Sequence, residues 1–395
     1  MSGSEPFEVL IAGGGCAALE AAFRLQRVAE GRVDTTILAP DEHFATQALS
    51  VLVPFAAGHT PHESLADLAS RAGARLRRGR LASVDTAERR VATDGGETIA
   101  YDALLVAVGA VQRAPYPHVL AFGSPGTADR MHGLVQDLEA GYVRRIAFVV
   151  PDGASWPVPL YELALMTAER AYDVGESCEL TLVTPEAAPL ALFGPDVSHA
   201  LATRLYAAGV TVLTGVHADV PRSGVIDLQP GGERLTVDRI VALPEAGGPA
   251  VNGLPRDAAG FLPVDRHGRV TGVDGVYAAG DATTSSIKQG GLACQQADAA
   301  AEAIAAQAGA AIEPQPCRAL LQGVLLTERD TTFLRREPER AEDDNTAASE
   351  HALWWPPTKI AGRELARHIG GLPRRRAGSD PRTSIAGIVA GQLTS

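Results

Sequence analysis

The sequence predicts an α/β protein with two repeated strand–helix units and a small C-terminal α+β piece. Three observations support this prediction. The chain opens with an apolar strand at residues 7–12, a glycine-rich turn, and a helix at residues 19–28. A similar succession of strands and helices recurs between residues 145 and 213. The chain has 395 residues, which exceeds one ordinary domain and suits two or three.

The glycine-rich turn has the spacing Gly-x-Gly-x-x-Ala. Gly13 makes the sharp turn, Gly15 lets a pyrophosphate approach the backbone, and Ala18 keeps the helix close to the strand. The first N–H groups of the helix, at Cys16 and Ala17, then face the phosphates together with the positive end of the helix dipole. This pattern predicts a dinucleotide site, although tight turns also use glycine for conformational reasons alone.

The strands that follow offer a second contact to such a ligand. Residues 33–38 predict a buried parallel strand, whose end usually carries a carboxylate for the adenosine ribose. Ala39 holds that place here, so Asp41 or Glu42 must serve instead. Beyond it the sequence predicts a helix and then several strands, at residues 62–72, 76–84, 90–93, 97–99 and 103–108.

A second motif lies far downstream. An apolar strand at residues 275–279 runs into Gly280 and Asp281, and a long Ala-rich helix follows from about residue 291 to 308. With the opening turn, this order resembles the flavoproteins that have two dinucleotide-binding domains. The resemblance implies that Asp281 holds the ribityl chain of FAD and that the helix N-terminus faces the flavin. It also implies that Ala107 and Gly109, where another strand ends, border the cofactor.

The order of segments predicts how the chain is divided. We expect two Rossmann-like domains with a three-layer ββα architecture, both of the dinucleotide-binding type. The FAD-binding domain is discontinuous and takes residues 1–110 and 245–311, and the second domain takes residues 111–244. Residues 312–370 predict a C-terminal domain with strands at 320–327 and 331–336, a mobile stretch at 337–349 and a helix at 359–368. Residues 371–395 predict a disordered tail.

The second domain lacks a conventional glycine loop. When its first helix is aligned on Glu162, the three glycine places fall at Ser155, Pro157 and Leu160. Proline removes an N–H donor, and Trp156 adds bulk where backbone would meet phosphate. We therefore expect that NAD(P)H does not bind in the usual manner. Glu186, after the next strand, remains a candidate contact to a ribose.

Residues 7–370 together resemble the sulfide:quinone oxidoreductase and type II NADH dehydrogenase branch of the FAD-dependent pyridine nucleotide-disulfide oxidoreductases. The sulfide-oxidising members use a pair of cysteines across the flavin, and this chain departs from them. Its cysteines have no close spacing and lie at positions 16, 178, 294 and 317. Cys294 is the candidate for chemistry because it lies about one turn into the helix, whose N-terminus lowers a thiol pKa. Packing among small residues is the favoured alternative.

Two further groups are expected near the flavin. Lys288 and Gln289 precede the same helix, and a cation at Lys288 would stabilise the reduced flavin. A solvated surface lysine is the alternative. In the resembling families the C-terminal region covers the flavin and builds a quinone pocket, which suits Trp354 and Trp355. These two tryptophans could equally cement the small domain to the rest.

The predicted function is a FAD-dependent oxidoreductase that passes electrons from a small-molecule reductant to a quinone-like or protein acceptor. An NAD(P)H:acceptor reductase and a flavin-binding subunit of a larger complex are the alternatives. The net charge of −12 argues against nucleic acid. The scattered cysteines predict neither disulfides nor a metal site, which favours the cytoplasm. No apolar run is long enough to span a membrane. Residues 360–369 support at most weak membrane-surface association, and a homo-oligomer stays open.

Overall fold

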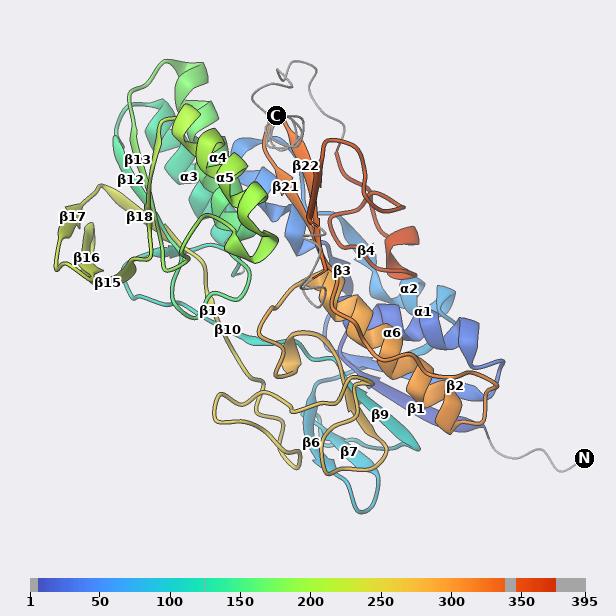
Figure 1. Cartoon of the computed structure of the whole chain (residues 1–395). Helices are drawn as coiled ribbons and strands as arrows, with labels where there is room; N and C mark the ends of the chain where they lie inside the picture. Colours follow the sequence, from blue (N-terminus) through green and yellow to red (C-terminus); the bar gives the residue numbers. More distant parts are fainter. Residues whose placement is uncertain (1–5, 125, 338–345, 374–395) are drawn as a thin grey trace, which may run out of the picture.

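Five parallel strands form the sheet of the first unit, in the order β20-β9-β1-β2-β5 (Figure 1). The computed structural model describes residues 6–124, 126–337 and 346–373. The strands are β1 (Phe7–Ala12), β2 (Val33–Ala39), β5 (Arg75–Arg78), β9 (Ala103–Val106) and β20 (Val276–Ala278). Their apolar side chains are almost all buried, as expected for a parallel sheet covered on both faces.

The two faces of this sheet are covered differently. Helices α1 (Cys16–Val28) and α6 (Gly290–Gln307) pack together on one face through small side chains, mostly alanine. An antiparallel sheet covers the other face with β6 (Leu81–Asp85), β7 (Arg90–Thr93) and β8 (Thr98–Ala100). This three-layer arrangement confirms the predicted fold class.

The second unit repeats the plan. Its parallel sheet has the order β11-β18-β12-β13-β14. The strands are β11 (Leu120–Ala121), β12 (Arg145–Val149), β13 (Glu179–Thr184), β14 (Val210–Thr214) and β18 (Arg239–Ala242). Helices α3 (Thr127–Glu139), α4 (Val158–Val174) and α5 (Pro195–Ala207) contribute to one hydrophobic core, and the antiparallel strands β15 (His217–Arg222), β16 (Val225–Gln229) and β17 (Arg234–Thr236) to another.

The two units are joined by the antiparallel pair β10 (Val111–Arg113) and β19 (Glu245–Gly247). Strands of the first sheet therefore come from both sides of the second unit in sequence, at β9 and β20. The division of the chain at residues 110, 244 and 311 stays a prediction.

Three elements in the first unit differ in detail from expectation. The expected strand at residues 76–84 is divided between β5 and β6, because the chain leaves one sheet for the other near Gly79, whose φ is +149°. The expected helix at 62–72 begins as strand β4 (His62–Ser64), which pairs with β3 (His43–Ala45). Helix α2 (Leu65–Arg71) then starts after Ser64, whose side chain accepts a hydrogen bond from the Asp67 N–H at 3.2 Å.

The C-terminal piece is a three-stranded antiparallel sheet of β21 (Leu321–Leu326), β22 (Thr331–Arg336) and β23 (Thr346–Ser349). It packs against the hydrophobic core that includes α4 and α5. The stretch predicted to be mobile thus ends in a strand, and its residues 338–345 lie outside the described residues. Residues 374–395 of the predicted disordered tail lie outside them too, whereas Leu372 packs against that core.

The expected helix at residues 359–368 is wrong. Only a single 3₁₀ turn forms there, at Leu365–Arg367. The N–H groups of Glu364 and Leu365 do not bond to carbonyls one turn back, because they donate to the side chain of Glu20, each at 2.7 Å. A distant carboxylate therefore replaces the local helical hydrogen bonds.

Candidate functional site

The opening turn borders a cleft of about 990 Å³ between the first sheet and α6. Most of the residues that the sequence assigned to a cofactor line this cleft, namely Gly13, Gly15, Cys16, Ala17, Asp41, Ala107, Gly109, Gly280 and Asp281. Ala18 lies fully buried beneath the turn, where its small side chain lets helix and sheet approach. The two distant motifs therefore meet at one cavity.

The turn itself has the geometry of a phosphate cradle. Gly13 adopts φ +130°, and a Cβ there would lie 2.1 Å from the Ala107 carbonyl oxygen. Gly15 faces open space, since a Cβ on it would meet nothing within 4 Å. Among the described residues no side chain caps the N-terminus of α1, which leaves its first N–H groups available to a ligand. These features fit the pyrophosphate of a dinucleotide.

The Gly280–Asp281 turn closes the same cleft from the other side. Gly280 adopts φ +77°, and a Cβ there would lie 3.2 Å from the methyl groups of Ala17 and Ala293. Its N–H donates to Gln296 Oε1 at 2.7 Å. Burial raises the pKa of Asp281, and Lys288 opposes this rise. Within the described part of the chain no hydrogen bond engages the Asp281 carboxylate, which leaves it available to a ligand hydroxyl.

The part of the cleft near Asp41 separates the two candidate carboxylates for the adenosine ribose, and two histidines also lie there. Asp41 lines the cleft, whereas Glu42 pairs with Arg78 at 3.1 Å. His43 and His62 also line the cleft, with ring centroids 6.4 Å apart. Sequence reasoning missed these histidines because it expected a helix where β4 forms, and so did not predict the pairing of β3 with β4 that brings them together.

Lys288 and Gln289 do not line the cleft. The Lys288 ammonium donates to the Thr283 carbonyl and lies 3.8 Å from the ring centroid of Phe261. Burial lowers its pKa to about 8. Gln289 caps α6: its Oε1 accepts from the Leu292 N–H and its Nε2 donates to the Gln322 carbonyl, both at 2.7 Å. Its side chain is thus occupied in joining α6 to β21.

Cys294 is buried at 1% exposure and lies between α1 and the C-terminal segment. The expected lowering of its pKa is wrong: burial raises that pKa well above its ordinary value, and Glu20 adds to the rise. Cys16 borders the cleft, but burial raises its pKa to about 12. Neither thiol is in an environment that favours a thiolate.

The corresponding loop of the second unit is filled by the chain itself. A Cβ on Gly153 would lie 2.9 Å from the side chain of Glu245. Trp156 packs edge-on against Phe193, with ring centroids 5.8 Å apart. Pro157 is buried and takes the N-cap position of α4. The side chains of this loop are therefore engaged within the protein.

The candidate ribose contact of that unit is also engaged. Glu186 Oε2 accepts a hydrogen bond from the Tyr161 hydroxyl at 2.6 Å and another from the Thr184 hydroxyl at 3.0 Å. Burial raises the pKa of both Tyr161 and Glu186. The carboxylate thus serves an internal network at the position where a ribose would bind.

A buried ion pair lies at the start of α4. Glu162 is completely buried, and both its oxygens contact Lys359 Nζ, at 2.6 and 2.7 Å. The Leu326 N–H also donates to Glu162, at 2.7 Å. Ile360, the residue after this lysine, lines the cleft. Sequence reasoning missed the pair because its members are far apart in the chain and no local pattern links them.

The two C-terminal tryptophans differ in their surroundings. Trp354 packs edge-on against Phe333 with centroids 5.0 Å apart, and its Nε1–H donates to the Thr358 carbonyl at 3.1 Å. Trp355 is 86% exposed. Neither lines the cleft. The contacts of Trp354 favour a cementing role for that residue.

The described residues include no helix long and apolar enough to cross a membrane. They also include no group of three or more His, Cys, Asp or Glu side chains arranged for a metal ion.

Comparisons with known proteins agree with this geometry. The family described as pyridine nucleotide-disulphide oxidoreductase matches residues 7–301. The sulfide:quinone oxidoreductase of Aquifex aeolicus superposes with a TM-score of 0.78 at 16% identity, covering 87% of this chain and 86% of that one. NDH2 from Plasmodium falciparum gives 0.58 at 14%, covering 71% and 64%. The NAD-dependent persulfide reductase of A. fulgidus gives 0.59 at 18%, covering 84% and 64%. No curated protein sequence matches the chain.

Proposed function

Because the chain belongs to the pyridine nucleotide-disulphide oxidoreductase family and is an FAD-dependent oxidoreductase, we propose that it passes electrons from a small reductant to a quinone-like or protein acceptor. The observation that carries this proposal is the cleft in which the Gly13 turn and the Asp281 turn meet. FAD bound there would supply two-electron redox chemistry. A cytoplasmic location suits the four free cysteines.

The residues of the cleft suit the parts of FAD. The N–H groups of Cys16 and Ala17 at the uncapped start of α1 would bind the pyrophosphate. The free carboxylate of Asp281 would accept hydrogen bonds from the ribityl hydroxyls. Asp41 is the candidate for the adenosine ribose.

The filled loop of the second unit favours a donor other than NAD(P)H. Trp156 packs on Phe193, Pro157 takes the N-cap of α4, and Glu186 is bonded to Tyr161, which supports this proposal. The similarity to a sulfide:quinone oxidoreductase makes sulfide or another thiol the donor class to test first, with a quinone as acceptor.

An anaerobic titration followed by flavin absorbance tests this proposal. We expect the purified protein to bind FAD, to lose its absorbance near the flavin maximum on addition of sulfide or a thiol, and to recover it with a quinone analogue. Bleaching by NADH alone would instead support the reductase alternative. Co-purification with a partner, with no response to either reductant, would support a flavin-binding subunit.

The proposed role of Lys288 in stabilising the reduced flavin is tested separately. If its charge stabilises the reduced flavin, Lys288→Ala lowers the flavin reduction potential, measured by equilibration with a reference dye. The contact with Phe261 argues for the other outcome, because the ammonium rests on that ring and does not line the cleft. An unchanged potential would remove Lys288 from the mechanism.

A further inference from the structure

A C-terminal segment of residues 359–369, here named the strap, lies across the start of α6. Its first residue, Lys359, is fixed on Glu162. Ile360 enters the wall of the cleft, and the Ala361 nitrogen lies 3.5 Å from the position of a Cβ on Gly291. A side chain on that glycine would be in van der Waals contact with the strap. The strap therefore closes one end of the cleft by close backbone packing.

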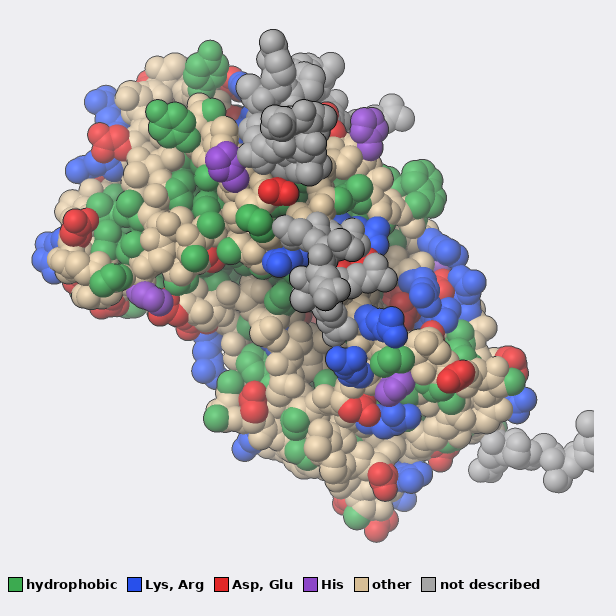
Figure 2. Space-filling model, viewed as in Figure 1, with side chains coloured by type: hydrophobic (Ala, Val, Ile, Leu, Met, Phe, Trp, Pro, Cys, Tyr) green, Lys and Arg blue, Asp and Glu red, His purple; other side chains and the backbone are tan. Residues whose placement is uncertain are grey.

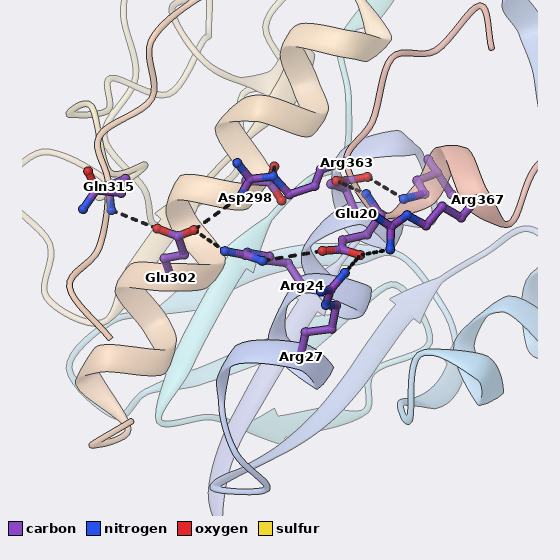
Figure 3. A network of polar contacts seen from close by, with 10 residues as sticks. Glu20, Arg24, Arg27, Asp298, Glu302, Gln315, Arg363 and Arg367 are labelled. Atoms are coloured by element: carbon purple, nitrogen blue, oxygen red, sulfur yellow. Dashed lines mark hydrogen bonds and ion pairs between the residues drawn. The ribbon is translucent and has the colours of Figure 1, made fainter. Parts of the chain in front are cut away.

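The far end of the strap is fastened to Glu20, which is completely buried on α1 (Figure 3). Its two oxygens accept hydrogen bonds from the N–H groups of Glu364 and Leu365, both at 2.7 Å. A Cβ on Gly362 would lie 2.6 Å from Glu20 Oε2, so glycine is needed for this approach. Hydrogen bonds to an ionised carboxylate are about twice as strong as neutral ones.

A second buried acid, Asp298 on α6, lies beside Glu20. Its Oδ1 is buried and has no hydrogen-bond partner among the described residues, and Arg363 Nε approaches its Oδ2 at 3.8 Å. Burial, followed by the negative charge of Glu20, raises the pKa of Asp298 to about 8. Burial raises the pKa of Glu20 as well, so these two acids favour one shared proton over two negative charges.

The remaining charges around this pair come from three parts of the chain. They are Arg24 and Arg27 on α1, Glu302 on α6, and Arg363, Glu364 and Arg367 on the strap. The thiols of Cys16 and Cys294 also face the pair. Arg27, Arg363 and Arg367 are each more than half exposed, and Figure 2 shows Lys and Arg side chains gathered over this part of the surface. Solvent thus screens three of these four guanidinium groups. Glu20 and Asp298 therefore depend on their shared proton to limit the repulsion between them.

We propose that the strap is a proton-dependent latch on the cofactor cleft, closed while Glu20 and Asp298 share a proton and loosened when that proton leaves. Loss of the proton places two negative charges side by side in a buried site, and moving the strap away admits water to them. The closed state binds the proton more tightly than an open state with ordinary carboxyl groups. Closure therefore weakens as pH rises to about 8. The effect on flavin rests on the proposed function.

Hydrogen exchange of the FAD-loaded full chain, read by mass spectrometry on residues 360–368 and corrected for intrinsic exchange rates, tests the latch. We expect protection of these amides to fall at least about tenfold between about pH 6 and about pH 9. Asp298→Asn removes the titration and should keep the strap protected at both values. Glu20→Ala should remove the protection at both. Constant protection in the wild-type chain, or an opened strap in Asp298→Asn, would overturn the proposal.

Glu169→Gln is the matched control, because Glu169 is a similarly buried carboxylate that pairs with Arg204 at 2.8 Å and lies on α4, away from the strap. Strap protection should not change in this variant. If Glu20→Ala does not fold, Glu20→Gln and the wild-type pH series still test the latch, since a side chain of the same length stays at position 20 in both.

Release of FAD, followed by its fluorescence, tests the link to the cleft. We expect release to be about tenfold faster at the higher pH in the wild type and unchanged in Asp298→Asn, in step with the exchange data. An opened strap with constant FAD release would overturn the link. If the protein binds no FAD, the proposed function fails, and exchange on the flavin-free chain still decides whether the two acids control the strap.

Discussion

The two parallel-sheet units share one plan, a strand followed by a turn and a helix, but they use the start of that helix differently. In the first unit no side chain caps α1, and its turn borders the cleft. In the second unit Trp156 and Pro157 fill the turn. The first turn of α4 carries Glu162, which binds Lys359 of the chain's own C-terminal segment.

This difference shows that a helix start is a ligand site only while its polar groups and the space before it stay free. The second unit has kept the strands and the helix of a nucleotide-binding fold. Its acidic residues, Glu162 and Glu186, have become internal anchors. The second unit therefore supports the C-terminal piece and the strap, and the first unit keeps an open cleft at its turn.

The largest effect is expected from a substitution that disrupts the turn of the first unit. Gly13→Ala places a methyl group 2.1 Å from the Ala107 carbonyl oxygen at φ +130°. The backbone angle costs about 1–3 kcal/mol, and the forced contact adds about 1–3 kcal/mol. We expect loss of bound FAD and a lower free energy of unfolding, measured by absorbance and urea denaturation. The control is Gly31→Ala, which also has positive φ but open space around it; equal losses in both variants would show that the contact is unimportant.

The next largest effect is expected from loss of the Glu162–Lys359 ion pair, the internal anchor of the second unit. Lys359→Met leaves the buried Glu162 without its cation and should lower the free energy of unfolding by about 3–5 kcal/mol. Chemical denaturation measures this loss. The double variant Lys359→Met with Glu162→Gln removes both charges and should recover part of it. No recovery in the double variant would mean that packing, and not the unpaired charge, caused the loss.

A smaller effect tests whether the second site can be reopened. Tyr161→Phe removes the hydrogen bond to Glu186 and should lower the free energy of unfolding by about 1.5–3 kcal/mol. Calorimetry with NADH should still detect no binding, because Trp156 and Pro157 remain in place. Tyr206→Phe, at an exposed tyrosine, is the control and should change nothing. Binding of NADH to the Tyr161 variant would show that Glu186 alone closed the site.

The smallest effect concerns Cys294. Because its pKa is raised by burial, Cys294→Ala should leave the flavin spectrum and turnover unchanged and lower the free energy of unfolding by about 1 kcal/mol through lost packing. Steady-state assays with every active donor measure this. Cys178→Ala, at a half-buried cysteine far from the cleft, is the control. A large loss of turnover in the Cys294 variant alone would return this thiol to the mechanism.

The sequence alone predicted most strands and helices of the two units and both motifs, because these depend on local patterns of apolar residues and on glycine spacing. Both motifs border the cleft, as predicted. Tertiary structure decided which polar side chains face that cleft. Lys288 and Gln289 turn to Phe261 and β21, and the expected C-terminal helix gives way to a strap.

The physical reason is the sequence separation of the partners. Glu20 and Leu365 are 345 residues apart, and Glu162 and Lys359 are 197 apart. Burial of a carboxylate demands a donor or a cation, but it does not specify where in the chain that partner lies. Local patterns therefore gave the two units and their turns, and only the packed chain left one helix start facing a cleft and bound the other to the protein itself.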